Sequence, residues 1–223
     1  MKKLTIAILM LLTSFSTVSA EIGLKVGFTA QLGEFEISGT ESENGAVSAT
    51  KKEQGFVGLG SYFIEQNLGI LPGPLSRINI GYSHVPHELK SGTKANVRTD
   101  QDEDNLDSDV TNAISADISN YDTLYVSVNI FDWLYVKAGT VDLDVKTTEN
   151  LQTGSAYPNT SLSGDILGLG VHHQSESGFF GRIEYLETSI GGTTLTSTTN
   201  ADNTVTLKDM NGDTLSVSFG KAF

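Results

Sequence analysis

The chain has 223 residues, of which 38% are apolar and 18% are charged, and this composition is typical of one folded domain. It contains no cysteine, which excludes disulfides, thiolate metal sites and a cysteine nucleophile. Its formal net charge of −13 at pH 7 argues against nucleic acid as a partner, because a nucleic-acid-binding face must be basic.

The first twenty residues have the pattern of a signal peptide that is removed on export. Lys2 and Lys3 form a charged start, an apolar stretch runs to Phe15, and Val18-Ser19-Ala20 is a small-residue cleavage site. An uncleaved N-terminal anchor helix is the alternative, but about a dozen apolar residues are short for a membrane span. We therefore expect a signal peptide over 1–20 and an exported domain over 21–223.

The rest of the chain alternates apolar with small or polar residues, the period of a β-strand with one lipid-facing side. The pattern predicts an all-β fold, a closed antiparallel up-and-down transmembrane β-barrel with eight strands. A soluble β-sandwich is the alternative. The strands are expected at about 22–37, 52–66, 77–89, 121–131, 133–147, 162–173 and 179–190, with the last one ending at Phe223. The phase changes after Gly139, which suggests a bulge or an exit from the membrane there.

The connections between these strands are alternately long and short, as in outer-membrane barrels. The long ones are polar, are expected outside the cell, and lie near 40–51, 90–120, 148–161 and 191–204. The short ones lie at 68–76, 132 and 174–178. Asn211-Gly212 is a hairpin signal, which we interpret as a hairpin or bulge in the external part of the last strand.

These features together resemble the small OmpX/OmpA-type, opacity-porin-like outer-membrane barrels of Gram-negative bacteria. The most specific element is the C-terminal strand Leu215-Ser-Val-Ser-Phe-Gly-Lys-Ala-Phe223. The resemblance implies that a terminal residue such as Phe223 is the signal recognised by the barrel-assembly machinery.

Strand alternation predicts a polar network inside the barrel. The expected lumen residues are Lys25, Lys137, Arg182, Glu184, Tyr62, Tyr125 and Tyr135. The interior of an eight-stranded barrel is just wide enough for side chains to fill it, so these groups would form a plug. Several glycines on the same face leave a thin water-filled passage as the alternative.

Candidates for other chemistry are weaker. Asp100, Asp102 and Asp104 begin like a calcium loop, but Asn105 replaces the turning glycine, so only a weak association with cations is expected. His87, Glu88 and Ser91 are the residue types of a lipid hydrolase, without a nucleophile motif. We expect no catalytic residues, no structural metal and no cofactor.

The sequence leaves two functional classes open. One is a structural or surface-interaction barrel whose loops meet an extracellular ligand or phage, and the other is a narrow porin-like channel. An outer-membrane lipid hydrolase is a distant third. The expected partners are outer-membrane lipid and lipopolysaccharide, with the barrel-assembly machinery during biogenesis and no nucleic acid.

Overall fold

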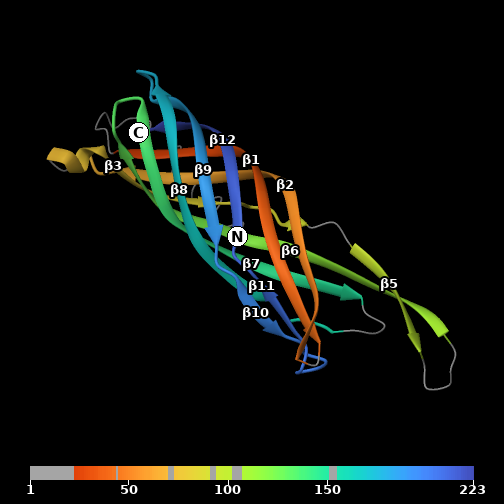
Figure 1. Cartoon of the computed structure of the whole chain (residues 1–223). Helices are drawn as coiled ribbons and strands as arrows, with labels where there is room; N and C mark the ends of the chain where they lie inside the picture. The colour runs from red at the N-terminus through yellow and green to blue at the C-terminus, as the bar shows by residue number, and fades with distance from the viewer. Residues whose placement is uncertain (1–22, 44, 70–72, 91–93, 102–106, 151–154) are drawn as a thin grey trace.

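Eight antiparallel strands pair in a closed ring, in the order β1-β12-β9-β8-β7-β6-β3-β2 and back to β1 (Figure 1). The computed structural model describes residues 23–43, 45–69, 73–90, 94–101, 107–150 and 155–223. The predicted signal peptide lies outside these residues. Within them, no helix is long and apolar enough to cross a bilayer. The predicted fold class is confirmed.

Seven strands of the ring have 12 to 23 residues, and the eighth has 7. They are β1 (Leu24–Glu43), β2 (Ala46–Asn67), β3 (Ile78–His84), β6 (Asp107–Asn129), β7 (Leu134–Asn150), β8 (Thr160–Gln174), β9 (Phe179–Ile190) and β12 (Met210–Ala222). Four shorter strands pair outside the ring, namely β4 (Leu89–Lys90) and β5 (Lys94–Gln101) with β6, and β10 (Thr193–Thr196) with β11 (Thr204–Leu207), which pairs with β1. A short 3-10 helix, η1 (Gly73–Arg77), leads into β3.

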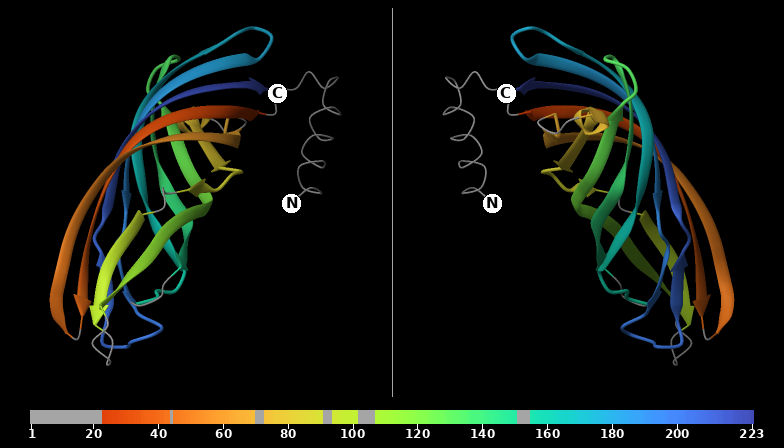
Figure 2. Two further views of the ribbon diagram at one scale, coloured as in Figure 1. Left: turned by 90° about the vertical axis from the view of Figure 1, so that its right-hand side faces the viewer. Right: turned by 90° about the vertical axis from the view of Figure 1, so that its left-hand side faces the viewer.

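The two ends of the barrel differ. At the turn end, which carries Phe223, the strands are joined by short connections around η1, 130–133 and 175–178, as predicted. Gly178 makes the last of these turns with φ of +86°, a conformation that side chains with a Cβ rarely adopt. At the opposite end, the extension end, the strands run on past the barrel body, and β5 with its part of β6 projects away from it (Figures 1 and 2).

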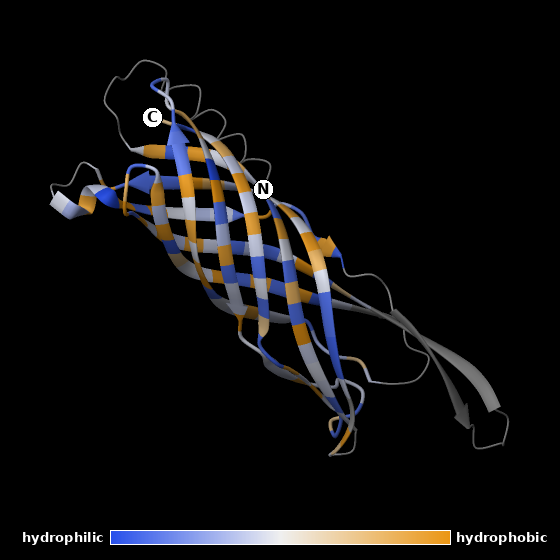
Figure 3. Cartoon of the chain, turned by 45° about the horizontal axis from the view of Figure 1, so that its top comes forward, coloured by the Kyte–Doolittle hydropathy of each residue, from blue (hydrophilic) through white to orange (hydrophobic). Residues whose placement is uncertain are grey.

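Apolar side chains form a belt around the outside, and hydropathy alternates along each strand (Figure 3). Exposed members of the belt include Phe28, Ile64, Ile80, Val126, Val136, Leu169, Ile183 and Val217. Toward the extension end, the outward-facing side chains change from apolar to acidic. The next outward-facing residue in that direction is Glu34 after Leu32, Asp165 after Leu167 and Asp213 after Leu215. An apolar belt around a polar interior is the arrangement of a barrel in a bilayer and the opposite of a soluble sandwich.

Two predicted external loops are largely strands. Pairing of β1 with β2 continues to Glu43↔Ala46, so residues 40–51 form the tip of a hairpin. Residues 90–120 contain β4, β5 and the first part of β6. The polar composition of these segments predicted that they lie outside lipid. Paired strands in water do not need an apolar face, so polarity alone could not distinguish a loop from a strand. The links near 148–161 and 191–204 contain shorter irregular segments.

Two local interpretations also need correction. Asn211 and Gly212 lie within β12 and pair with Glu36 and Phe35 on β1. The Phe35 ring packs where a side chain on Gly212 would be, so the glycine makes room for this ring and does not form a turn. The irregularity lies one step earlier, between β11 and β12, which both pair with β1.

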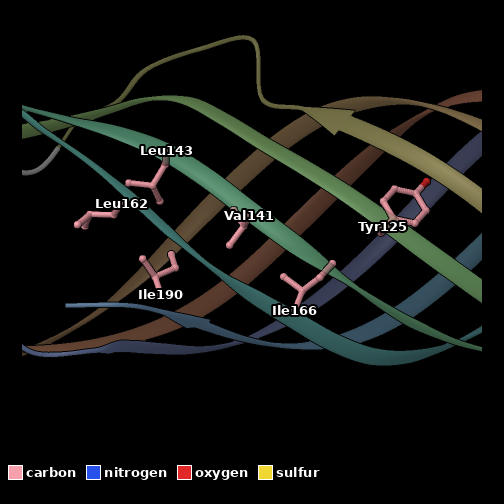
Figure 4. Packing of buried hydrophobic residues seen from close by; sticks show 6 residues of the cluster. All are labelled: Tyr125, Val141, Leu143, Leu162, Ile166 and Ile190. Carbon is pink, nitrogen blue, oxygen red and sulfur yellow. The ribbon is translucent and has the colours of Figure 1, made fainter. Parts of the chain in front are cut away.

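There is no bulge at Gly139, because β7 pairs continuously with β8 from Leu134 to Val145. The phase of β7 is constant, and the interior itself changes from polar to apolar: Val141 and Leu143 follow Lys137 and Gly139 on the inward face. These residues belong to a buried apolar cluster with Tyr125, Leu162, Ile166 and Ile190 (Figure 4).

The barrel closes where the C-terminus meets β1. The Phe223 backbone N–H donates to the Leu24 carbonyl (2.8 Å), and the Gly23 N–H donates to the Phe223 carbonyl (3.0 Å). These bonds continue the β1–β12 ladder to the last residue, so Phe223 completes the ring.

A ring in which every strand pairs with two neighbours should resist detergent. We expect the protein folded in mild detergent to migrate differently in unheated SDS and after boiling, because closed barrels offer SDS no strand edge to open. Electrophoresis with and without heating, together with circular dichroism, measures this. Identical migration in both states or a helical spectrum would contradict the fold.

Candidate functional site

A layer of charged side chains crosses the lumen near the turn end. This charged layer consists of Lys25, Glu65, Lys137, Arg182 and Glu184, all of which are buried. Glu65 on β2 is its centre: Arg182 on β9 donates to both Glu65 oxygens at 2.7 and 2.9 Å. Lys25 Nζ lies 3.3 Å from Glu65 Oε1 and 3.1 Å from Asn79 Oδ1. The bidentate geometry joins β2 to β9, three strands away around the ring.

A second ion pair lies beside the first. Lys137 Nζ is 3.2 Å from Glu184 Oε1 and 3.9 Å from the centre of the Tyr125 ring. Ser216 donates to the other Glu184 oxygen at 3.4 Å. Both buried carboxylates therefore have cationic and hydroxyl partners, which a buried charge requires.

The structure places six of the seven predicted lumen residues inside: Lys25, Lys137, Arg182, Glu184, Tyr125 and Tyr135. Tyr62 is the exception and lies on the outer surface, with its ring centre 5.3 Å from that of His84. By alternation, an inward Tyr62 would place Leu59 and Phe63 toward lipid, whereas both are buried in the interior.

Glu65 was missed for the same reason, because it shares its face of β2 with Leu59 and Phe63. A signal for it was present in the sequence. A carboxylate facing lipid is costly, so the charge of Glu65 and not the apolar character of Phe63 should have set the phase of this strand.

Glycines opposite the tyrosines allow the lumen to fill. A Cβ on Gly81 would collide with the Tyr125 ring, and one on Gly170 would collide with the Tyr135 ring. The space left between Thr29, Lys137, Arg182 and Ser218 is about 20 Å³, which is room for about one water molecule.

The apolar cluster forms a second layer between the charged layer and the extension end. Val141 and Ile190 are completely inaccessible to solvent, and Leu143 is 2% exposed. Ile118, Tyr121, Val145 and Met210 pack against the cluster from the side of the extensions. Along the β6–β9 side of the wall the interior thus changes from paired charges to packed apolar side chains.

A polar cluster lies on the outside of the barrel, where β2, β3 and β6 meet. Tyr82 donates to Asp122 Oδ1 (2.6 Å), which is also 2.6 Å from His84 Nδ1. His84 is in turn the last residue of β3 paired with β2, opposite Tyr62. The apolar belt ends at this polar cluster on β3 and β6, whereas on β2 the exposed Phe56 lies further toward the extension end.

The remaining predicted candidates do not come together as a site. Asp100 lies in β5, while Asp102, Asp104 and Ser91 are outside the described residues. His87 and Glu88 are exposed and follow the end of β3. Within the part of the chain that is described, no three His, Asp or Glu side chains are arranged to hold a metal ion.

Beyond the belt, hydrogen bonds tie β6, β7 and β8 together at Asp144. Ser161 donates to Asp144 Oδ1 (2.6 Å) and Asn120 donates to Oδ2 (2.7 Å). These two hydrogen bonds lower the pKa of the Asp144 carboxyl below its ordinary value. Asn120 has φ of +52° and lies in the irregular step between Ser119 and Asp122.

No family model and no curated protein matches the sequence. Among solved structures, similarity extends to the outer membrane protein OprG of Pseudomonas aeruginosa (9% identity, TM-score 0.41, 88% of this chain and 97% of that one). It also extends to Neisserial surface protein A (10%, 0.34, 88% and 97%) and to Ail of Yersinia pestis bound to a heparin analogue (11%, 0.30, 85% and 98%). These TM-scores are below 0.5, so the fold rests on the strand ring and the apolar belt. That architecture is a β-barrel with an apolar outer belt.

Removing the Arg182 guanidinium should destabilise the barrel. Arg182→Met leaves Glu65 with Lys25 as its remaining cation, and breaking a buried pair costs about 3–5 kcal/mol. We expect a lower urea midpoint in lipid vesicles, and a smaller loss for the triple variant Arg182→Met, Glu65→Met, Lys25→Met, which removes the whole ion cluster around Glu65 and leaves neither an unpaired carboxylate nor an unpaired cation.

The matched control is the exposed pair Lys52–Glu36, whose atoms are 2.8 Å apart. Lys52→Met should cost less than about 1 kcal/mol. Equal losses for Lys52→Met and Arg182→Met would show that the charged layer does not stabilise the fold.

The Asp144 hydrogen bonds predict a local pH effect. The folded pKa is depressed, so the contribution of Asp144 to stability is complete above its unfolded pKa and is lost as the pH falls through the folded pKa. Ser161→Ala should raise the folded pKa toward the ordinary value, measured by carboxyl NMR titration. Ser177→Ala, at the turn end, should leave it unchanged, and an unshifted titration in Ser161→Ala would contradict the assignment.

Proposed function

We propose that this protein is a non-conducting outer-membrane barrel with a structural or surface-interaction role, and that its strand extensions are the surface that meets other molecules. The observation that carries the proposal is the filled lumen. The Arg182–Glu65 pair and the Tyr125 and Tyr135 rings occupy the interior at the level of the charged layer, where the cavity beside Thr29, Lys137 and Ser218 has about 20 Å³.

The orientation follows from the two ends. Short turns at one end and long projections at the other are the pattern of barrels whose termini lie in the periplasm. The hairpins β1–β2 and β5–β6 and the strands β10 and β11 would then stand outside the cell. Paired strands present a more rigid surface than flexible loops do, so less conformational entropy of the protein is lost when a ligand binds there.

The competing function is the narrow channel, which requires a continuous water path. Both layers oppose it. Ions would have to displace the Arg182–Glu65 bonds and then pass the apolar cluster, where no charged partner is available among the side chains that form it. The proposal includes no catalytic step.

Planar-bilayer conductance separates the two functions. We expect the refolded protein to give no single-channel steps, and Arg182→Met alone to remain silent because the apolar layer is intact. Adding Val141→Ala and Ile190→Ala to Arg182→Met should open a water path and produce steps, since the three changes remove side-chain volume from both layers. Regular steps from the unaltered protein would overturn the sealed barrel in favour of the channel.

A further inference from the structure

The wall of the barrel is not fully paired between β2 and β3. Their ladder runs from Asn67↔Asn79 to Tyr62↔His84 and ends there, whereas β2 continues to Ala46 with β1 on its other side. Within the described residues, no backbone hydrogen bond joins 85–88 to β2. We call the unpaired stretch, from Gly58 to Gly60 on β2 and from Pro86 to Glu88 across from it, the β2–β3 gap.

The direction of the backbone groups in the gap follows from the neighbouring bonds. The Asn67 N–H donates to Gly23 beside β1, and the Leu68 N–H donates to Ile78 beside β3. In an antiparallel strand the N–H and C=O of one residue point to the same side, and the side alternates along the chain. Gly58 and Gly60 therefore direct both of their backbone groups into the gap.

Pro86 explains why the ladder stops. The next residues in register after Tyr62↔His84 are Val85, whose N–H donates to Tyr121 on β6, and Pro86, which would face Gly60. Proline has no N–H and cannot continue a ladder. The ring is thus interrupted by one residue whose chemistry forbids the bond.

The side chains around the gap are aromatic and polar, as is typical of the boundary between lipid tails and headgroups. On the outward face of β2, Gly58 and Gly60 stand between Phe56, which is 83% exposed, and Tyr62. The polar cluster of Tyr82, His84 and Asp122 lies at one side of the gap, and the His87 ring reaches to within 3.9 Å of the place where a Cβ on Gly60 would stand. Unpaired backbone groups at membrane depth are costly and call for a polar partner.

We propose that an outer-leaflet lipid with amide-linked acyl chains docks at the β2–β3 gap, with its amide groups beside Gly58 and Gly60 in place of the missing strand. An amide offers one donor and one acceptor, which matches the N–H and C=O of each glycine. Its acyl chain would lie on the bare surface left by the two glycines, next to Phe56. The inference rests on the proposed outer-membrane location.

Lipid A, whose chains include amides, and phosphatidylglycerol, whose chains are joined by esters, are the probes. Because the chain has no cysteine, Phe56→Cys can carry a single environment-sensitive fluorophore in nanodiscs. Leu167→Cys on β8, four strands away in either direction around the ring, is the matched control label. We expect a saturable response to lipid A at position 56, at least tenfold weaker with phosphatidylglycerol, and none that saturates at position 167.

Two variants test the mechanism. Pro86→Ala restores an N–H opposite Gly60, so the ladder can extend and lipid A binding should fall at least tenfold, with slower hydrogen exchange at Gly60. Gly60→Pro removes one donor without removing a bond to β1, and should also weaken binding. Pro74→Ala in η1 is the control and should bind as the unaltered protein does.

Equal responses to the two lipids, equal responses at both labels, or unchanged binding in both Pro86→Ala and Gly60→Pro would overturn the inference. Heat-dependent migration of the same nanodisc samples shows separately whether the barrel has inserted. Inserted protein without selective binding refutes the lipid site alone, whereas failure to insert refutes the proposed function as well.

Discussion

Every backbone N–H and C=O in a bilayer needs a partner, and this constraint governs the rest of the structure. A sheet meets it by closing on itself, which here happens along the β1–β12 ladder from Glu36↔Asn211 to the bonds of Phe223 with Gly23 and Leu24. Closure fixes which side chains face inward. The inward faces then hold three cations and two carboxylates on four different strands, brought to within hydrogen-bond distance by the curvature of the wall.

The interior is consequently organised in layers along the barrel axis. Charges are neutralised near the turn end, and apolar side chains pack nearer to the extensions. The second layer serves as a small core for the part of the barrel that leaves the membrane, where Val141 and Ile190 are fully buried. In the same region Asp144, Ser161 and Asn120 link three neighbouring strands from outside.

The sequence allowed the fold and most of the lumen to be predicted, because a lipid-facing side and an inward side differ sharply in polarity. Arg182 and Glu184 were assigned inward on this ground. The rule failed on β2, where neither side of the strand is clearly polar. Leu59 and Phe63 lie on the inward side, and Gly58 and Gly60 lie on the outward side. The two sides were therefore assigned the wrong way round, and Glu65 was missed. Strand pairing beyond the membrane could not be predicted either, because polar strands lack an alternation of apolar and polar residues. The end of the β2–β3 ladder at Pro86 could not be predicted because it depends on the register of the two strands.

The central claim is that alternate residues face lipid and a sealed, charged interior. Because the chain lacks cysteine, single cysteines at neighbouring positions test it directly. In vesicles, cysteines replacing Phe28, Leu169 and Val217 should react with a lipid-phase maleimide, while those replacing Thr29, Ser216 and Ser218 should react with neither this reagent nor a water-soluble one. Lipid-phase labelling of the second set, or its rapid labelling from water, would contradict the barrel register or the sealed lumen.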